Sequence, residues 1–331
     1  MRVNPQTRLA ALGLLLATPA AGAAPLVVAD IPPVHSLVAR VMEGVGRPEL
    51  LLPPGASPHH FALRPSEAER LERAELVFWI GEALTPQLED AMEALAGDAE
   101  VVELMDADGV RQLAFREGTL FEPHEHGDDD NDHDDAAHEE YDHGEDQAHD
   151  EHEGHDHHGA DPHVWLDPEN ARAMMSAIAA ALSDKDPEHA ARYAANAAAG
   201  RAEVAALIPE IDAMLAPARG KPFFVFHDAY HHFEARFGVE AAGAISLSEA
   251  TPPGPRRLDE LREAVRSRHV LCVFAEPQFD PKLAALVTEG TEARAAALDP
   301  LGAGLEPGPA LYPTLLRDIA ASLAACLDRA R

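Results

Sequence analysis

The stretch PEHAARYAANAAAGRAEVAALIPEIDAML, residues 187–215, is the longest helical pattern in this chain of 331 residues. Proline at its start fits the first turn of a helix, and alanine has the highest helix propensity of all residues. Gly200 costs about 1 kcal/mol in a helix interior, and Pro209 is a candidate kink point. At 1.5 Å per residue the helix would be ~40 Å long, about the height of two domains. The stretch therefore predicts a stiff connector between two units.

Short apolar runs alternate with helical patterns on both sides of this connector. In the first half, strands are expected at 26–30, 49–52, 76–80 and 100–104, and helices at 34–45, 65–73, 86–95 and 170–182. In the second half, strands are expected at 223–226, 270–275 and 295–298, and another unit of the alternation is expected to start at 239–245. Helices are expected at 229–237, 258–267, 281–288 and 312–327. Such alternation predicts parallel strands that helices cover on both faces.

The predicted fold class is therefore α/β, with two parallel-sheet lobes joined by one long rigid helix. The expected division is a signal peptide at 1–23, an N-terminal lobe at 24–186, the linking helix at 187–217 and a C-terminal lobe at 218–331. The two halves share the pattern of alternation, but no repeat of the residues themselves is visible.

The N-terminus has the three parts of an export signal. Arg2 and Arg8 give a positive segment, residues 9–16 are apolar, and small residues end at Ala23, where cleavage is expected. The apolar part is too short to span a bilayer, and no other stretch reaches the ~20 apolar residues of a spanning helix. A buried N-terminal helix is the alternative. These features predict an exported, soluble protein of the periplasm.

Residues 122–160, the His/acid tract, contain ten histidines between His124 and His158, interleaved with Asp and Glu and without Lys or Arg. Such a segment has almost no apolar side chains to bury, so we expect it to be disordered without metal. Imidazole and carboxylate are the ligands of Zn²⁺ and similar cations. A solvated acidic linker needs charge but not histidine. The composition therefore favours metal collection.

The formal net charge of the chain is −32, and residues 122–161 contribute eighteen acids to it. The remainder of the chain is still acidic, which argues against a nucleic-acid or anionic-membrane partner. A cation is the substrate that suits this negative charge. Nothing in the sequence indicates an oligomer, and a monomer is expected.

The chain has two cysteines, Cys272 and Cys326. In an oxidising compartment an even pair is more often a disulfide than a reactive thiol. Closing a loop of this length would stabilise the fold by roughly 4 kcal/mol in the chain-entropy model. Two separate buried thiols are the alternative.

Candidate metal ligands lie where expected strands end, which is where open α/β sheets bind their ligands. His59 lies in the Pro/Gly-rich loop after the second strand, and His163 lies in DPHVWLDP. His227 directly follows the strand FFVF, and Asp299 follows a short strand. Since two candidates come from each half, a metal bound by them would join the two lobes.

Each candidate has a less specific interpretation. A histidine after a strand is commonly a hydrogen-bonded structural residue, and His227 and His231 could chelate a metal by themselves if they shared a helix face. His60, His232 and Asp228 are expected beside the site or at the surface. The aromatic residues Phe61, Trp79 and Trp165 are expected in the core, and His35, His189 and His269 at the surface or at helix ends.

Four segments together identify a family. PPGASPHHFALRPS, DPHVWLDP, FFVFHDAYHHFEARFGV and CVFAEPQFDPKLAALV with the later LDPLG resemble the substrate-binding proteins of zinc ABC importers, the ZnuA type of cluster A-I or cluster 9. The resemblance covers the whole mature chain. It implies two α/β lobes joined by one long rigid helix, a metal held between them, a His/acid-rich insertion and an ABC importer permease as partner.

The resemblance also implies site residues. His59, His163 and His227 would hold the metal with Asp299, and Cys272 and Cys326 would form a disulfide. Some zinc-type relatives place a carboxylate directly before the first histidine, where this chain has Pro58, so Asp299, a water or His60 would complete the ligand set. Manganese-type relatives have a carboxylate where this chain has His227. Three imidazoles favour tetrahedral Zn²⁺.

The function predicted from the sequence is high-affinity capture of periplasmic Zn²⁺ and its delivery to the permease, with the tract as auxiliary collector. One alternative is a periplasmic zinc buffer or chaperone without a permease. The other is a zinc hydrolase, since three histidines and a water also hold catalytic zinc, with Glu276 as the nearest general base. No catalytic residue is otherwise expected.

Overall fold

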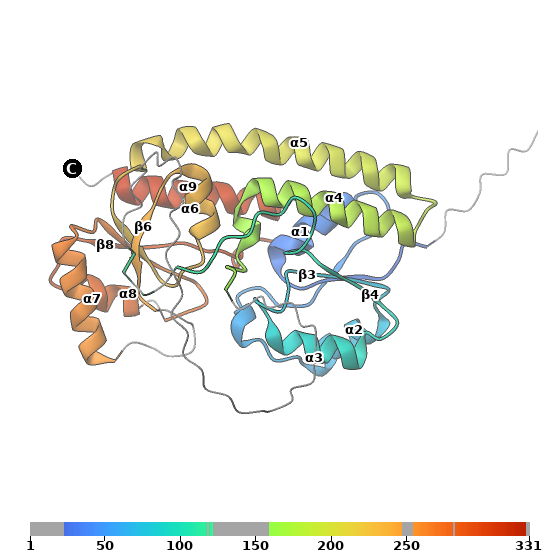
Figure 1. The fold of residues 1–331 in the computed structure, drawn as a ribbon, viewed down its shortest axis with the longest axis horizontal. Helices are drawn as coiled ribbons and strands as arrows, with labels where there is room; N and C mark the ends of the chain where they lie inside the picture. Colours follow the sequence, from blue (N-terminus) through green and yellow to red (C-terminus); the bar gives the residue numbers. More distant parts are fainter. Residues whose placement is uncertain are drawn as a thin grey trace, which may run out of the picture.

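A computed structural model describes residues 23–116, 118, 120–121, 159–246, 254–280 and 282–328. The predicted signal peptide before Ala23 and nearly all of the His/acid tract lie outside the described residues. Two four-stranded sheets, one in each half of the chain, form the framework of the molecule (Figure 1).

The N-terminal sheet has the order β2-β1-β3-β4, and all of its pairs are parallel. Its strands are β1 (Val27–Ala29), β2 (Glu49–Leu50), β3 (Leu76–Trp79) and β4 (Glu100–Glu103). The helices of this half are α1 (Pro32–Val41), α2 (Pro65–Arg73), α3 (Pro86–Leu95) and α4 (Pro168–Lys185), with the short 3-10 helices η1 (Pro58–His60) and η2 (Val164–Leu166). Since β1 and β3 are apolar on both faces, they lie in the middle of this sheet.

The C-terminal sheet has the order β6-β5-β7-β8, which is the same order relative to the chain. Its strands are β5 (Phe223–Val225), β6 (Ala241–Ala244), β7 (Cys272–Ala275) and β8 (Arg294–Ala297). The helices of this half are α6 (His231–Phe237), α7 (Pro255–Ser267), α8 (Lys282–Thr288) and α9 (Leu311–Asp328), and the 3-10 helix η3 (Ala216–Ala218) precedes β5. The two halves are thus one topology used twice, although their residues show no repeat.

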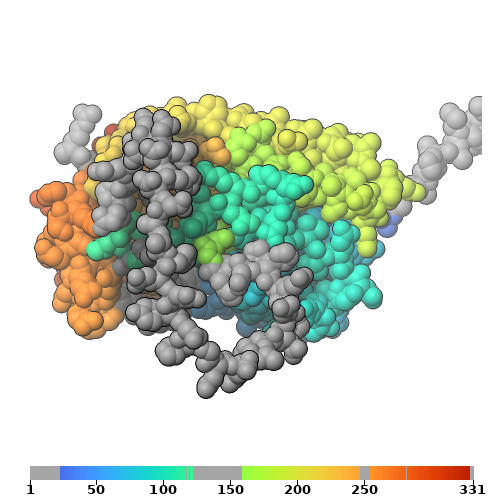
Figure 2. Space-filling model, viewed as in Figure 1, coloured from blue at the N-terminus to red at the C-terminus, as the bar shows by residue number. Residues whose placement is uncertain are grey.

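Helix α5 (Ala190–Leu215) extends along both lobes and lies over α4 at one end and α9 at the other (Figure 1). In the space-filling view, α4 and α5 form a continuous ridge along one edge of the molecule (Figure 2). A side-chain Cβ at Gly200 would lie 2.9 Å from Met175 Sδ and 3.1 Å from Arg40 Cγ, so glycine permits this close packing. The helix continues through Pro209.

One hydrophobic core extends through both lobes. It contains β1 and β3 residues of the first sheet, the buried face of α5, and the buried face of α9 from Leu311 to Leu327. A second, smaller core lies in the C-terminal lobe and includes Phe226, Leu261 and Val287. Because the main core is continuous, the connector joins the lobes through buried apolar contact as well as through the chain, as the predicted stiff linker requires.

The predicted elements are confirmed in type, and several ends differ by one to four residues. Proline begins α1, α4 and α7 earlier than expected, at Pro32, Pro168 and Pro255, because it fits the first turn of a helix. Phe61, Trp79 and Trp165 are buried, as predicted. The prediction for His35 was wrong.

His35 is only 8% exposed, although a position at the surface or a helix end was expected. It lies in α1, and its Nε2 atom is 3.2 Å from the carbonyl oxygen of Pro48. That partner is thirteen residues away in the sequence, and no local pattern indicates it.

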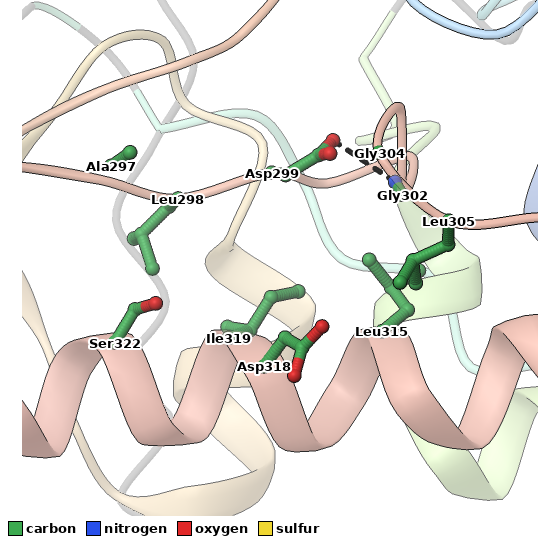
Figure 3. A pocket seen from close by; sticks show the side chains of 10 residues that line it. All are labelled: Ala297, Leu298, Asp299, Gly302, Gly304, Leu305, Leu315, Asp318, Ile319 and Ser322. Atoms are coloured by element: carbon green, nitrogen blue, oxygen red, sulfur yellow. Dashed lines mark hydrogen bonds between the residues drawn. The ribbon is translucent and has the colours of Figure 1, made fainter.

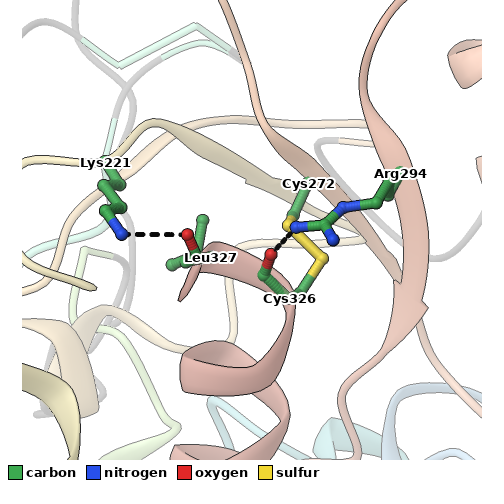
Figure 4. Close-up of a disulfide and its surroundings, with 5 residues drawn as sticks. All are labelled: Lys221, Cys272, Arg294, Cys326 and Leu327. Atoms are coloured by element: carbon green, nitrogen blue, oxygen red, sulfur yellow. Dashed lines mark hydrogen bonds between the residues drawn. A yellow bond between two sulfur atoms is a disulfide. The ribbon is translucent and has the colours of Figure 1, made fainter. Parts of the chain in front are cut away.

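A disulfide joins Cys272 of β7 to Cys326 near the end of α9 (Figure 4). Lys221 Nζ donates to the carbonyl oxygen of Leu327 at 3.0 Å, and the Arg294 guanidinium donates to that of Cys326. The end of α9 is therefore fixed to the C-terminal sheet. In the part of the chain that the structure describes, no helix combines the length and apolarity needed to cross a membrane.

Removing this disulfide tests its contribution to stability. Because the bridge closes a loop with a sequence separation of 54 residues, Cys272→Ala/Cys326→Ala should lower the free energy of unfolding by roughly 4 kcal/mol. Urea unfolding followed by circular dichroism measures this change. Dithiothreitol should destabilise the wild type and leave the double variant unaffected. Equal unfolding midpoints for oxidised wild type and variant would contradict the expectation.

Candidate metal centre

Three histidines from separate segments meet between the lobes. His59 lies in η1, where Pro58 begins the turn and the Ser57 hydroxyl accepts a hydrogen bond from the His59 amide at 3.2 Å. His163 is the residue that precedes η2. His227 follows β5. His59 and His163 come from the first half of the chain and His227 comes from the second, so the cluster joins the two lobes.

The three imidazoles have the geometry of a metal site. One nitrogen from each ring lies within 4.8 Å of the others. The ring centroids are 5.4 Å apart for His59 and His163, 5.8 Å for His59 and His227, and 5.2 Å for His163 and His227. The Nε2 atoms of His163 and His227 are 3.4 Å apart. Two nitrogens bound to tetrahedral Zn²⁺ would be ~3.3 Å apart, given Zn–N bonds of about 2.05 Å.

Two buried carboxylates orient these rings. Asp161 Oδ1 is 2.6 Å from His163 Nδ1, and Glu276 Oε1 is 2.9 Å from His227 Nδ1. An ionised carboxylate can only accept a hydrogen bond, so it places the ring proton on Nδ1. The lone pair is then on Nε2, the atom that faces the cluster. This carboxylate–imidazole arrangement is usual where histidine binds a metal.

Burial keeps His59 and His163 neutral. It lowers the pKa of His59 to about 2, and the neighbouring His163 and His227 rings act in the same direction. Burial also lowers the pKa of His163 well below its ordinary value. Neutral imidazole is the form that binds a metal ion, so His59 and His163 need not lose a proton at neutral pH.

The topology explains why His227 and Glu276 meet. β5 and β7 are the two central strands of the C-terminal sheet, and the chain leaves them in opposite directions. Such a switch point is where open α/β sheets bind ligands. His227 lies just beyond β5 and Glu276 directly follows β7. The expectation that candidate ligands follow strands is met at this sheet.

The other histidines near the site are not in the cluster. His60 is exposed. His227 precedes α6, which begins at His231, so the two residues do not share a helix face and the condition for a local chelating pair is not met. His232 is buried, and its Nε2 atom is 3.2 Å from the carbonyl oxygen of Asp161. His232 therefore supports the loop that carries His163.

Asp299 is not a member of the three-histidine cluster. Its Oδ1 accepts hydrogen bonds from the backbone amides of Leu301 and Gly302 at 3.0 and 2.9 Å, and from Gln278 Nε2 at 3.2 Å. Its Oδ2 accepts one from the Ala303 amide at 2.6 Å. Asp299 also lines a cavity of about 350 Å³ between the loop after β8 and α9, with Asp318 on the helix side (Figure 3). The carboxylate is thus held in a fixed orientation.

Reasoning from the sequence missed the roles of two residues. Asp161 stands two residues before His163, and its Oδ1 also accepts the His163 amide at 3.0 Å, a turn that Asp-Pro-His could have indicated. Glu276 was considered only as a general base of a hydrolase. It is 2% exposed and holds the His227 ring. Since its partner is 49 residues away, only the folded chain shows this role.

Two α/β lobes on one long helix, with buried imidazoles between them, define a metal-binding protein of the substrate-binding class. The chain matches the family described as "Zinc-uptake complex component A periplasmic" over residues 27–326. It therefore belongs to the ZnuA family. This is a family of zinc-uptake components and not of enzymes, so the hydrolase alternative is set aside.

Named relatives agree with this assignment. A "High-affinity zinc uptake system protein ZnuA" from Brucella suis is 45% identical over 306 residues, covering 92% of each chain. The protein so described from Paracoccus denitrificans is 44% identical over 319 residues, covering 96% of each chain. A crystal structure of a ZnuA has the same fold, with a TM-score of 0.71 at 22% identity, covering 92% of this chain and 99% of that one.

The buried imidazoles make the metal-free protein sensitive to acid. The pKa of His59 is about 2 in the folded state and about 6.5 in the unfolded state, so below pH 6.5 only the unfolded state gains a proton. Stability from this group is present above pH 6.5 and is lost as the pH falls. Between pH 7 and pH 5 the loss is about 2 kcal/mol.

Urea unfolding of chelator-treated protein at the two pH values tests this expectation. His59→Gln removes the titrating group and keeps a similar volume, so it should lose about 2 kcal/mol less than the wild type between pH 7 and pH 5. Equal losses for the two proteins would show that the His59 ring is not buried as a neutral group.

Proposed function

We propose that this protein captures Zn²⁺ outside the cytoplasm and delivers it to the permease of an ABC importer. The observation that carries the proposal is the meeting of His59, His163 and His227, with ligand nitrogens within 4.8 Å of one another. The family's description as a zinc-uptake component and the names of the relatives support zinc as the substrate and an importer as the partner.

The chemistry of the cluster supports Zn²⁺ as the cargo. Three imidazoles suit Zn²⁺, while Mn²⁺ prefers sites richer in oxygen. The 3.4 Å separation of the two Nε2 atoms requires little movement before they bind one tetrahedral ion. Carboxylates on the far side of two rings increase the basicity of these ligands. The site can therefore bind zinc with little reorganisation.

The His/acid tract would collect zinc weakly at several sites and raise its concentration near the centre. This role rests on its composition, ten histidines among acids, since ligands of this kind bind borderline cations. We further propose cleavage of the signal peptide near Ala23 and a monomeric mature protein. Mass spectrometry of the exported protein and light scattering measure these two properties.

Zinc titration distinguishes the centre from the tract. A variant that lacks residues 122–160 should bind one zinc ion tightly in competition with a chromophoric chelator, and His227→Ala in the same background should abolish that binding. The full-length protein should bind additional, weaker zinc. If the shortened protein bound no zinc tightly, the metal would be held by the tract, and a zinc buffer without a permease would become the better function.

Asp299 is the proposed fourth ligand. Its Oδ2 accepts a hydrogen bond from the Ala303 amide and can accept another interaction, and backbone amides hold the carboxylate in place. Asp299→Asn keeps an oxygen at this position but removes the charge, so zinc affinity should fall more than about tenfold. Asp318→Asn, at an exposed carboxylate beside the same cavity, is the matched control. Wild-type affinity in Asp299→Asn would mean that water completes the ligand set.

A further inference from the structure

Arg116 binds two carboxylates of the C-terminal lobe. Its Nε atom donates to both oxygens of Asp228, at 3.1 and 2.9 Å, and its Nη2 also donates to Asp228. Its Nη1 donates to Glu234 Oε2 at 2.7 Å. The guanidinium carbon lies 3.9 Å from the ring centroid of Phe121, and the Arg116 side chain is only 9% exposed. All three guanidinium nitrogens of Arg116 therefore donate hydrogen bonds to these carboxylates.

The segment that carries Arg116 extends from the N-terminal half onto the C-terminal lobe. Ala114 forms an antiparallel bridge with Ala160, and Leu120 forms one with Gly243 of β6. The Phe121 amide donates to the carbonyl oxygen of Ala242 at 3.2 Å. Residues 113–121 lead directly into the His/acid tract. Arg116 therefore fastens the segment that precedes the tract to the lobe that carries His227.

Asp228 is the residue directly after His227. Asp228 is nevertheless absent from the group of side chains whose ligand atoms meet at the centre. Its oxygens are bound to the Arg116 guanidinium instead. A hard oxygen ligand is thus held beside an imidazole site but outside it.

We propose that Arg116 determines the metal specificity of the centre by holding the Asp228 carboxylate away from the ion. This inference rests on the proposed zinc-binding function and adds a residue that none of the sequence motifs includes. Without Arg116, Asp228 is a free carboxylate next to a ligand histidine. An added carboxylate ligand makes the site richer in oxygen and raises its coordination number, which favours Mn²⁺ relative to Zn²⁺.

The ion pair between Arg116 and Asp228 can be tested with single and double variants of the full-length protein. Co²⁺ at less than one equivalent reports the coordination of the tightest site, since tetrahedral Co²⁺ absorbs visible light much more strongly than five- or six-coordinate Co²⁺. Arg116→Gln should weaken this absorption. It should also raise the ratio of Mn²⁺ to Zn²⁺ affinity by roughly tenfold or more, the size of an outer-sphere change at a metal site.

The second substitution tests whether the effect of Arg116→Gln acts through the Asp228 carboxylate. Arg116→Gln/Asp228→Asn lacks the released carboxylate, so its Co²⁺ spectrum and affinity ratio should return to wild-type values. Arg236→Gln is the matched control. Arg236 forms another ion pair across the lobes, with Asp167 at 2.7 Å, but Asp167 is not adjacent in sequence to a proposed ligand. This control should keep the wild-type spectrum.

Arg116→Lys covers the case in which Arg116→Gln does not fold. Lysine keeps the positive charge but cannot bind both oxygens of Asp228, so a smaller change in the same direction is expected. An unchanged spectrum in a folded Arg116 variant, or a changed one that the double variant retains, would overturn the inference. If the wild type had no Co²⁺ site, or if His227→Ala left that site intact, the proposed function would be overturned instead.

Discussion

The continuous hydrophobic core beneath α5 is the constraint on which the rest of the structure depends. The buried faces of α5 and α9 belong to the same core as the central strands of the N-terminal sheet. Trp165 Nε1 donates to the carbonyl oxygen of Pro300 at 2.9 Å, and the Tyr312 hydroxyl donates to that of Trp165 at 2.8 Å. These contacts join the segment of His163 to the C-terminal lobe. The imidazoles of the two halves can meet because the lobes that carry them are packed together.

Between the packed lobes, the candidate metal centre combines burial of its histidines with carboxylates that fix the ring proton on Nδ1 of His163 and His227. Burial favours neutral imidazole, which is the metal-binding form, and it also makes an unpaired polar atom costly. Asp161 and Glu276 meet the second requirement by accepting from the Nδ1 atoms of His163 and His227. Each carboxylate comes from the same lobe as its histidine. Either lobe can therefore orient its own ligand, and the packing of the lobes brings the two rings together.

Charge beside the centre is controlled by pairing. The chain has a large excess of acids, and two of them, Asp161 and Glu276, contact the histidines of the cluster. Arg116 neutralises Asp228 and Glu234, Arg236 binds Asp167, and the backbone amides after Asp299 hold its carboxylate. An acidic protein can attract cations in this way while only selected oxygens reach the ion. Of these pairs, the one between Arg116 and Asp228 is the one that we propose to act on the selectivity of the site.

The sequence by itself determined the class of the fold, the long helix and three positions of the centre. Periodicity and proline fix where helices begin, and residues after a strand point to the ligand-binding edge of a sheet, so His59, His163 and His227 could be named from local patterns. The tertiary structure alone decided that both halves have the same strand order, that His35 is buried, and that Glu276 and Arg116 act on the residues around His227. Arg116 and Asp228 are 112 residues apart, and Glu276 is 49 residues from His227. No periodic pattern connects residues at those sequence separations. Such pairs can therefore be identified only in the folded chain.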